Sequence, residues 1–327
     1  MGRTPILIPV LVTVFIIGTH VRNAPAEDMT AAARLAADGL KAFEMGQYQK
    51  AVKALSMAVK MDPDNPYYSM ALGQAYLSAG KPKSAIPLLK WSLAAFPGDF
   101  DIRYTLAEAY LNADDFRYDL EALKVLAGKP PPEPMRAPWL FLKGFSLFRL
   151  GQYENAEPIF GELLAYKDME APAFFFLANC KFGKDRYEEA LPLYEKAIRL
   201  GSVPDNKALN AYFYDYGLAL YRLRKFGKAA EAFRNSIHLY PDDPLPRFFL
   251  GRCETEPGNI KEAVADYESL IDKFPNFGPA YYQLARLYAK QGDKKRAEEL
   301  FRKDATIKKN ASEEAEQRLA SKLKLGR

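Results

Sequence analysis

Few side chains in this sequence have types and spacings that could carry out chemistry. Of the two histidines, His20 lies in an apolar leader and His238 stands alone, with no partner implied by spacing. The sequence contains no HExxH, CxxC or GxSxG motif and no phosphate-binding glycine loop. We therefore predict no catalytic residues, no metal site and no cofactor.

Pairs of adjacent acidic residues are the remaining candidates for general acid–base work. Glu188-Glu189 and Glu298-Glu299 each lie in a helical pattern. Neighbouring residues on a helix point in different directions, so the two carboxylates of a pair cannot converge on one reacting atom. These pairs indicate solvated helix faces, and we expect the protein not to be an enzyme.

The elements that would position any functional side chain are helical hairpins, shown most clearly by the segment 66–99 (PYYSMALGQAYLSAGKPKSAIPLLKWSLAAFPGD). Small residues at Gly73 and Ala85 allow two helices to approach closely. Gly80 permits the backbone turn where the first helix ends, and Pro97 ends the second. The pattern predicts two antiparallel helices in this segment.

This unit recurs along the chain at an almost constant interval. The position of Ala85 holds an alanine in every unit except one, and its equivalents are Ala51, Asp119, Ala156, Ala190, Ala229, Ala263 and Ala297. These positions define eight units in total, at 32–65, 66–99, 100–133, 137–170, 171–204, 210–243, 244–277 and 278–311.

Over the range 32–311 the sequence resembles the tetratricopeptide repeat (TPR) family, whose unit is about 34 residues long and consists of a helix, a turn and a helix. The resemblance implies an all-α protein. We expect a right-handed α-solenoid of about eight TPR helix hairpins with a C-terminal capping helix.

Two segments depart from the repeat. Burying the Asp119 carboxylate is costly, so we expect the second helix of the third unit to shift register and to pack through Leu120, Leu123 and Leu126. After the last unit, Ser312 can cap a separate helix over positions 312–325, whose apolar stripe would cover the end of the array.

The two cysteines, Cys180 and Cys253, occupy the same repeat position two units apart. A disulfide requires Cα atoms within about 7 Å, and two intervening helix layers separate these residues further. We expect both to be small, buried apolar residues.

The segment 1–26 has the layout of a signal peptide. An uncharged apolar run, Pro5–Gly18, follows Arg3, and Ala24-Pro25-Ala26 forms a small-x-small cleavage site. We predict export with cleavage after Ala26, to the periplasm or the exterior. The alternative is an uncleaved membrane anchor, because Pro5–Val21 is near the shortest length that spans a bilayer.

The TPR resemblance implies a concave groove lined by the first helices. In this sequence, the positions that line the groove hold aromatic residues in the middle of the array and basic residues toward its C-terminal end. The predicted partner-binding residues are Tyr104, Phe141, Phe145, Phe175, Asn179, Tyr214, Arg252 and Arg286. The acidic-tail site used by cochaperones of this family is absent from the first unit, where Ala36 and Leu40 replace its Lys and Asn. Asn179, Arg252 and Arg286 form a looser set that could hold a carboxylate or backbone amides.

The net charge of +5, from 46 basic and 41 acidic residues, is too small to point to nucleic acid. We predict a non-catalytic scaffold or adaptor that binds a protein or peptide. Two alternatives remain open: a structural subunit of an envelope, secretion or pilus complex that uses its convex faces and loops, and an accessory domain for an envelope or glycan-synthesis enzyme.

Overall fold

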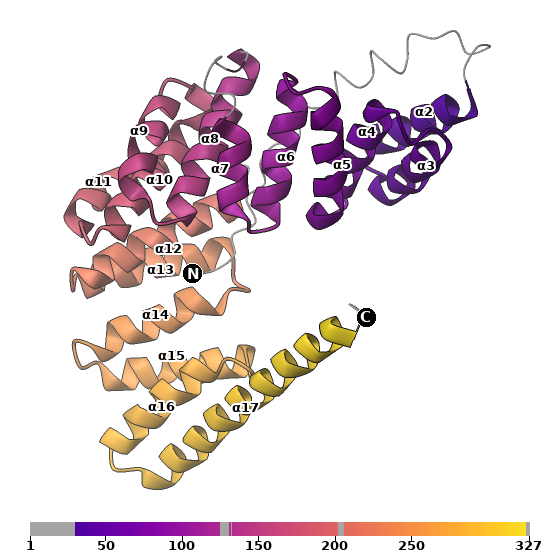
Figure 1. Ribbon diagram of the computed structural model, residues 1–327. Coiled ribbons are helices and arrows are strands. Elements are labelled where there is room, and N and C mark those ends of the chain that lie inside the picture. The colour runs from indigo at the N-terminus through magenta and orange to yellow at the C-terminus, as the bar shows by residue number, and fades with distance from the viewer. Residues whose placement is uncertain (1–29, 125–130, 132, 202–205, 325–327) are drawn as a thin grey trace. The chain divides into compact units, whose positions relative to one another are not determined.

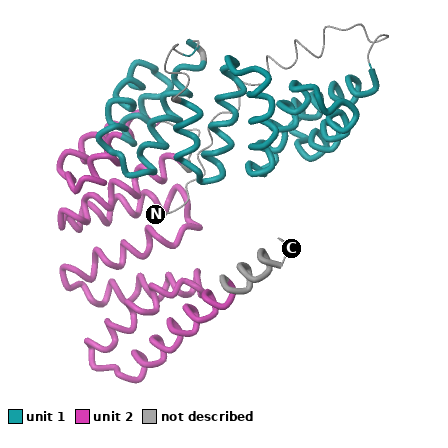
Figure 2. The backbone as a smooth tube through the Cα atoms, in the orientation of Figure 1, with its two compact units in different colours: residues 1–176 teal, residues 177–327 magenta. Residues whose placement is uncertain are grey.

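The protein is an all-α solenoid of helical hairpins. The computed structural model describes residues 30–124, 131, 133–201 and 206–324, and within these ranges it contains sixteen α-helices, one 3₁₀ turn (Lys167–Met169) and no strand (Figure 1). The chain divides into two compact units, residues 1–176 and 177–327, and the division falls within helix α10 (Figure 2).

Unit 1 contains four consecutive hairpins and the start of α10. The helices are α2 (Ala31–Glu44), α3 (Tyr48–Met61), α4 (Pro66–Ser78), α5 (Pro82–Ala95), α6 (Phe100–Asn112), α7 (Phe116–Lys124), α8 (Glu133–Arg149) and α9 (Tyr153–Leu163). Second helices also pack on the first helix of the following hairpin, as α3 does on α4 and α5 on α6.

Unit 2 repeats this arrangement. Its helices are the end of α10 (Glu170–Gly183), then α11 (Tyr187–Leu200), α12 (Asn206–Arg222), α13 (Phe226–Leu239), α14 (Pro244–Thr255), α15 (Ile260–Lys273), α16 (Gly278–Lys290) and α17 (Lys294–Lys324). Antiparallel pairs such as α12 with α13 and α16 with α17 make the most extensive contacts.

The turn between the helices of every hairpin has one residue with positive φ. These residues occupy the same repeat position eight times: Gly46, Gly80, Asp114, Gly151, Asp185, Arg224, Gly258 and Gly292. A left-handed residue ends a helix sharply, and glycine adopts this conformation without steric cost. The repeated turn agrees with the predicted count of about eight hairpins.

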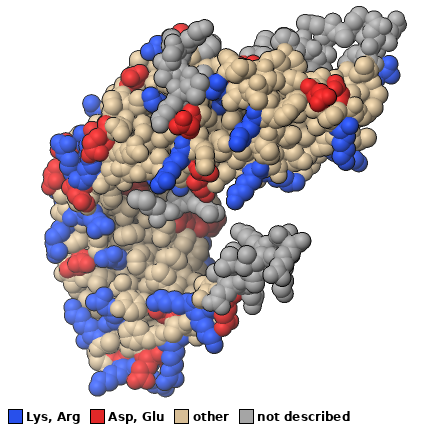
Figure 3. Space-filling view, viewed as in Figure 1, with Lys and Arg blue, Asp and Glu red and all other residues tan. Residues whose placement is uncertain are grey.

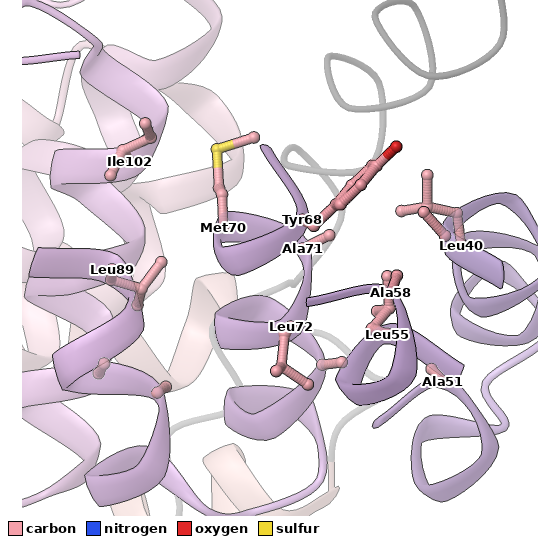
Figure 4. Close-up of a cluster of buried hydrophobic side chains, with 14 of the residues drawn as sticks. Leu40, Ala51, Leu55, Ala58, Tyr68, Met70, Ala71, Leu72, Leu89 and Ile102 are labelled. Atoms are coloured by element: carbon pink, nitrogen blue, oxygen red, sulfur yellow. The ribbon is translucent and has the colours of Figure 1, made fainter. Parts of the chain in front are cut away.

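The small residues do bring the helices together. A Cβ atom at Gly73 would lie 2.8 Å from Leu89 Cγ, and one at Gly144 would lie 2.8 Å from Phe160 Cε1. In both pairs the large residue follows the glycine at the same distance along the chain, and it is fully buried. Figure 4 shows the first hairpins, in which Leu55, Leu72 and Leu89 share one core.

The structure corrects the prediction for the third unit. Helix α7 keeps the repeat register: Leu123 is buried at the position equivalent to Leu89, and Asp119 is fully buried at the small-residue position. The carboxylate is accommodated because the Ser146 hydroxyl of α8 donates a hydrogen bond to Asp119 Oδ2. Leu120 is only partly buried, and Leu126 lies outside the described residues.

The C-terminal prediction also needs correction. The segment 312–324 is helical, but it continues α17, which runs without a break from Lys294 to Lys324. Ser312 therefore lies inside a helix and does not cap a new one, because the hydrogen-bonded helix of the last hairpin extends through it. The side chains at Leu319 and Leu323 of the predicted apolar stripe lie outside the described part of α17.

The remaining predictions concern the cysteines and the N-terminal leader. Cys180 and Cys253 form no disulfide and are buried, as expected, and burial raises the pKa of the Cys253 thiol to about 12. The N-terminal leader lies outside the described residues. Among the helices that are described, none combines the length and the apolar character needed to cross a bilayer.

Candidate partner-binding faces

The eight predicted partner-binding residues fall into two groups of four. Tyr104, Phe141, Phe145 and Phe175 belong to unit 1 and are all buried, with Tyr104 only 3% and Phe145 5% exposed. Asn179, Tyr214, Arg252 and Arg286 belong to unit 2, where the first three are partly buried and Arg286 is exposed. A partner role stays a prediction for both groups, but their surroundings differ.

In unit 1 the aromatic side chains pack on one another. The ring of Phe176 on α10 lies 5.5 Å from those of Phe141 and Phe145 on α8, and 5.1 Å from that of Phe175. Edge-to-face contacts of this kind stabilise a core beyond the area that they bury. These aromatic residues contribute to the packing between α8 and α10.

A buried polar group in unit 1 was not predicted from the sequence. The hydroxyl of Tyr104 donates a hydrogen bond to Glu108 on α6, and removal from water raises the pKa of Glu108 to about 7. Desolvation, with the nearby negative charge of Glu108, raises the pKa of Asp119 to about 8. Asp119 Oδ1 is buried without a hydrogen-bond partner. An aspartate at a position that otherwise requires a small apolar residue was the available signal.

In unit 2, Asn179 is held by its own neighbours. Its Oδ1 accepts a hydrogen bond from the Tyr194 hydroxyl, and its side chain also hydrogen-bonds the carboxylate of Asp215 on α12. Burial raises the pKa of Asp215 to about 7, although the bond from Asn179 favours the charged form. Sequence reasoning missed Asp215. Above about pH 7, where Asp215 is mostly ionised, a second carboxylate from a partner would be repelled there.

Arg252 on α14 has the geometry of a prepared cationic contact. Its guanidinium lies 4.9 Å from the ring centre of Tyr221 and 5.8 Å from that of Phe249. The carboxylate of Glu256 lies 4.0 Å from the Arg252 guanidinium, at the limit of ion-pair distance. Glu256 Oε1 also accepts a hydrogen bond of 3.1 Å from the Tyr221 hydroxyl. Aromatic rings keep the planar guanidinium in place while leaving its N–H groups able to bind an oxygen.

Tyr214 lies on α12, and Arg286 lies on α16 at the same repeat position as Arg252, one hairpin later. The ring of Tyr214 lies 6.0 Å from those of Phe233 and Phe249, and burial raises the pKa of Tyr214. Arg286 is exposed, 6.0 Å from the ring of Tyr282. We define the C-terminal face as Tyr214, Tyr221, Arg252 and Arg286. It combines apolar rings with cations, and so suits a segment with apolar and acidic groups.

The described residues include no group of three or more histidine, cysteine, aspartate or glutamate side chains placed to hold a metal ion.

Models of tetratricopeptide repeats match residues 141–206, 214–276 and 255–313, which is about half of the chain. The chain belongs to the tetratricopeptide repeat family. A repeat model described as anaphase-promoting complex, cyclosome, subunit 3, matches residues 44–128.

Curated relatives are distant. The TPR repeat-containing protein YpiA of Bacillus subtilis is 23% identical over 78% of this chain and 58% of its own length. The protein O-mannosyl-transferase TMTC1 of Homo sapiens is 24% identical over 72% of this chain and 26% of its own. The chain thus spans between a quarter and just over half of these two relatives.

Solved structures agree on the fold. A tetratricopeptide repeat protein from Parabacteroides merdae is 14% identical, with a TM-score of 0.59, over 84% of this chain and 98% of its own. The apo form of RapI is 11% identical, with a TM-score of 0.56, over 87% of this chain and 99% of its own. The TPR fold implies a protein or peptide partner, and the family is generally not catalytic.

Proposed function

We propose that this chain is a non-catalytic adaptor outside the cytoplasm, and that it holds a peptide or helix of another protein against the C-terminal face. The observation that carries the proposal is Arg252, stacked on Tyr221 and Phe249 with one carboxylate at the limit of ion-pair distance. An arginine side chain that aromatic rings already hold in place loses little side-chain entropy when it binds a partner. Arginine and tyrosine are typical binding hot spots.

The proposed partner segment has acidic or carbonyl oxygens for Arg252 and Arg286 and apolar groups for Tyr214 and Tyr221. Asp215 on α12, beside Asn179, disfavours an acidic group of the partner near α12. The partner segment should therefore bind the C-terminal face in one direction. An extended or helical segment would therefore place its apolar residues near α12 and its acidic residues near α14 and α16.

Affinity purification from the native envelope fraction tests this function. The variants Arg252→Ala and Arg286→Ala should weaken retention of the captured partner at least about fivefold, the effect of losing one hot-spot side chain. Arg234→Ala is the matched control, because Arg234 is an exposed arginine on a second helix, α13, where it pairs with Glu254 at 3.4 Å.

Photo-crosslinking then distinguishes this proposal from the assembly-subunit alternative. A crosslinking residue in place of Arg286 on α16 should label the partner, whereas one in place of the exposed Lys228 on α13 should not. Labelling from Lys228 alone would contradict binding at the C-terminal face and support contacts through the second helices.

The location outside the cytoplasm rests on the leader sequence, in which the apolar run Pro5–Gly18 precedes Ala24-Pro25-Ala26. Mass spectrometry of the purified N-terminus tests cleavage after Ala26. A mature chain that begins at Met1 would contradict cleavage and would favour a leader that is retained as a membrane anchor.

A further inference from the structure

The second helices of the first two hairpins differ in charge from the others. Neither α3 nor α5 contains an aspartate or glutamate, but together they carry five lysines, all exposed: Lys50, Lys53, Lys60, Lys83 and Lys90. Helix α9, the second helix of the fourth hairpin, has three glutamates and no lysine or arginine. In Figure 3 the helices α15–α17 of unit 2 carry closely mixed positive and negative groups.

Large apolar side chains are exposed among these lysines. Met57 is 47% exposed, Met61 55% and Trp91 41%. Met57 and Trp91 occupy the same position of consecutive hairpins. We call the exposed side of α3 and α5 the basic outer face.

The core residues explain why these side chains must face outward. Leu55 and Ala58 on α3 and Leu89 on α5 point into the core around α4 (Figure 4), and all three are fully buried. Because an α-helix turns by about 100° per residue, Lys53, Met57 and Lys60 lie on the side of α3 opposite to that core. Lys90 and Trp91 lie away from the core of α5 by the same argument. The nearest acidic residue after α3, Asp62, accepts a hydrogen bond of 3.2 Å from Asn65.

We propose that the basic outer face of α3 and α5 binds the surface of an anionic lipid bilayer. The lysines lie on helices that contain no carboxylate, and they are attracted to lipid phosphates. The indole of Trp91 suits the headgroup layer, which lies between the apolar lipid chains and water. An acidic protein would also attract the lysines, but it would not need three large apolar tips spread over two helices. The inference is independent of the C-terminal face.

Trp91 makes the proposal directly measurable. The chain has two tryptophans, and Trp139→Phe leaves Trp91 as the only fluorescent indole. In the full-length variant, Trp91 emission should move to shorter wavelength with vesicles of equal parts phosphatidylcholine and phosphatidylglycerol, and the shift should weaken at high salt. It should be absent with phosphatidylcholine alone. Co-sedimentation of the unsubstituted chain with the same vesicles gives a second readout that does not depend on Trp139→Phe.

Charge reversal then locates the contact. The double variant Lys53→Glu/Lys60→Glu should bind anionic vesicles at least about tenfold more weakly. The control Lys225→Glu/Lys228→Glu makes the same charge change at two exposed lysines at the start of α13 and should bind as the parent does. The variant Met57→Ser/Met61→Ser should reduce binding without changing its salt dependence.

Three results would overturn the proposal. Equal binding to neutral and anionic vesicles, with no shift of Trp91, would show that the apolar leader alone is responsible. Equal loss in both charge-reversed pairs would show attraction to net charge only. A Trp91 shift caused by polyglutamate but by no vesicle would identify an acidic protein as the partner of this face.

Discussion

In both units, the first helix of each hairpin carries side chains at equivalent repeat positions, but these side chains differ in how far they are buried. In unit 1, Tyr104 and Phe145 are buried, whereas in unit 2 Tyr214 is partly exposed and Arg286 is exposed. The same repeat position can therefore hold helices together in one unit and remain accessible in the other. A ring from the next hairpin contacts the first helix in both units, since Phe249 lies 6.0 Å from Tyr214 as Phe176 lies 5.5 Å from Phe145, so the difference lies in how much of each side chain stays exposed.

The largest expected effect tests this difference through stability. Phe145→Ala should lower the free energy of unfolding by about 3–5 kcal/mol, because it removes a buried ring and leaves a cavity. Tyr214→Ala should cost about 1–2 kcal/mol, since its ring is only partly covered. Urea unfolding of both variants, followed by circular dichroism, gives the two values. Equal losses would show that the two units do not differ in this way.

The buried carboxylates sharpen the comparison. Asp119→Asn should raise the free energy of unfolding at pH 8 by about 1–3 kcal/mol, because a neutral amide replaces a carboxylate whose Oδ1 has no partner. Asp215→Asn in unit 2 should give a smaller gain, because Asn179 already hydrogen-bonds that carboxylate. Urea unfolding at this pH measures both gains, and a larger gain for Asp215→Asn would contradict the comparison.

The pH dependence has a defined sign. Folding raises the pKa of Asp119 from 3.8 to about 8, so the folded protein binds more protons between these values. The free energy of unfolding should therefore fall as pH rises from about 4 to about 8 and level off above that. Asp119→Asn should remove part of this slope. A parent chain whose stability is constant across this range would contradict the raised pKa.

Close helix packing gives a smaller effect that should be common to both units. Gly144→Ala in unit 1 and Gly217→Ala in unit 2 each place a Cβ within 2.8 Å of a buried phenylalanine ring, and should cost about 1–2 kcal/mol after the gain in helix propensity. Gly161→Ala on α9 is the control. A Cβ there would meet nothing within 4 Å, so thermal unfolding should show no loss and a gain of up to about 1 kcal/mol.

Much of this fold could be predicted from spacing, because small residues, turn glycines and closing prolines recur at fixed intervals and each has a local mechanical reason. The fate of Asp119 could not. Local reasoning correctly judged its burial to be costly, but it could not know that Ser146 on the next helix would donate a hydrogen bond. The burial of Phe141 and Phe145 could not be decided from the sequence for the same reason, since Phe176 comes from the next hairpin. Asp215 lacked any signal, because its meeting with Asn179 depends on packing between α10 and α12.

The smallest expected effect concerns the turn residues. Asp114 in unit 1 and Arg224 in unit 2 take the left-handed conformation that glycine occupies at five equivalent turns. Aspartate tolerates this conformation better than arginine, because its short side chain can hydrogen-bond locally. Arg224→Gly should therefore raise the free energy of unfolding by up to about 1 kcal/mol, and Asp114→Gly by less. Thermal unfolding of the two variants measures the difference. A loss of stability in Arg224→Gly would show that the contact of its guanidinium with the Phe226 ring, 5.3 Å away, outweighs the strain of the turn.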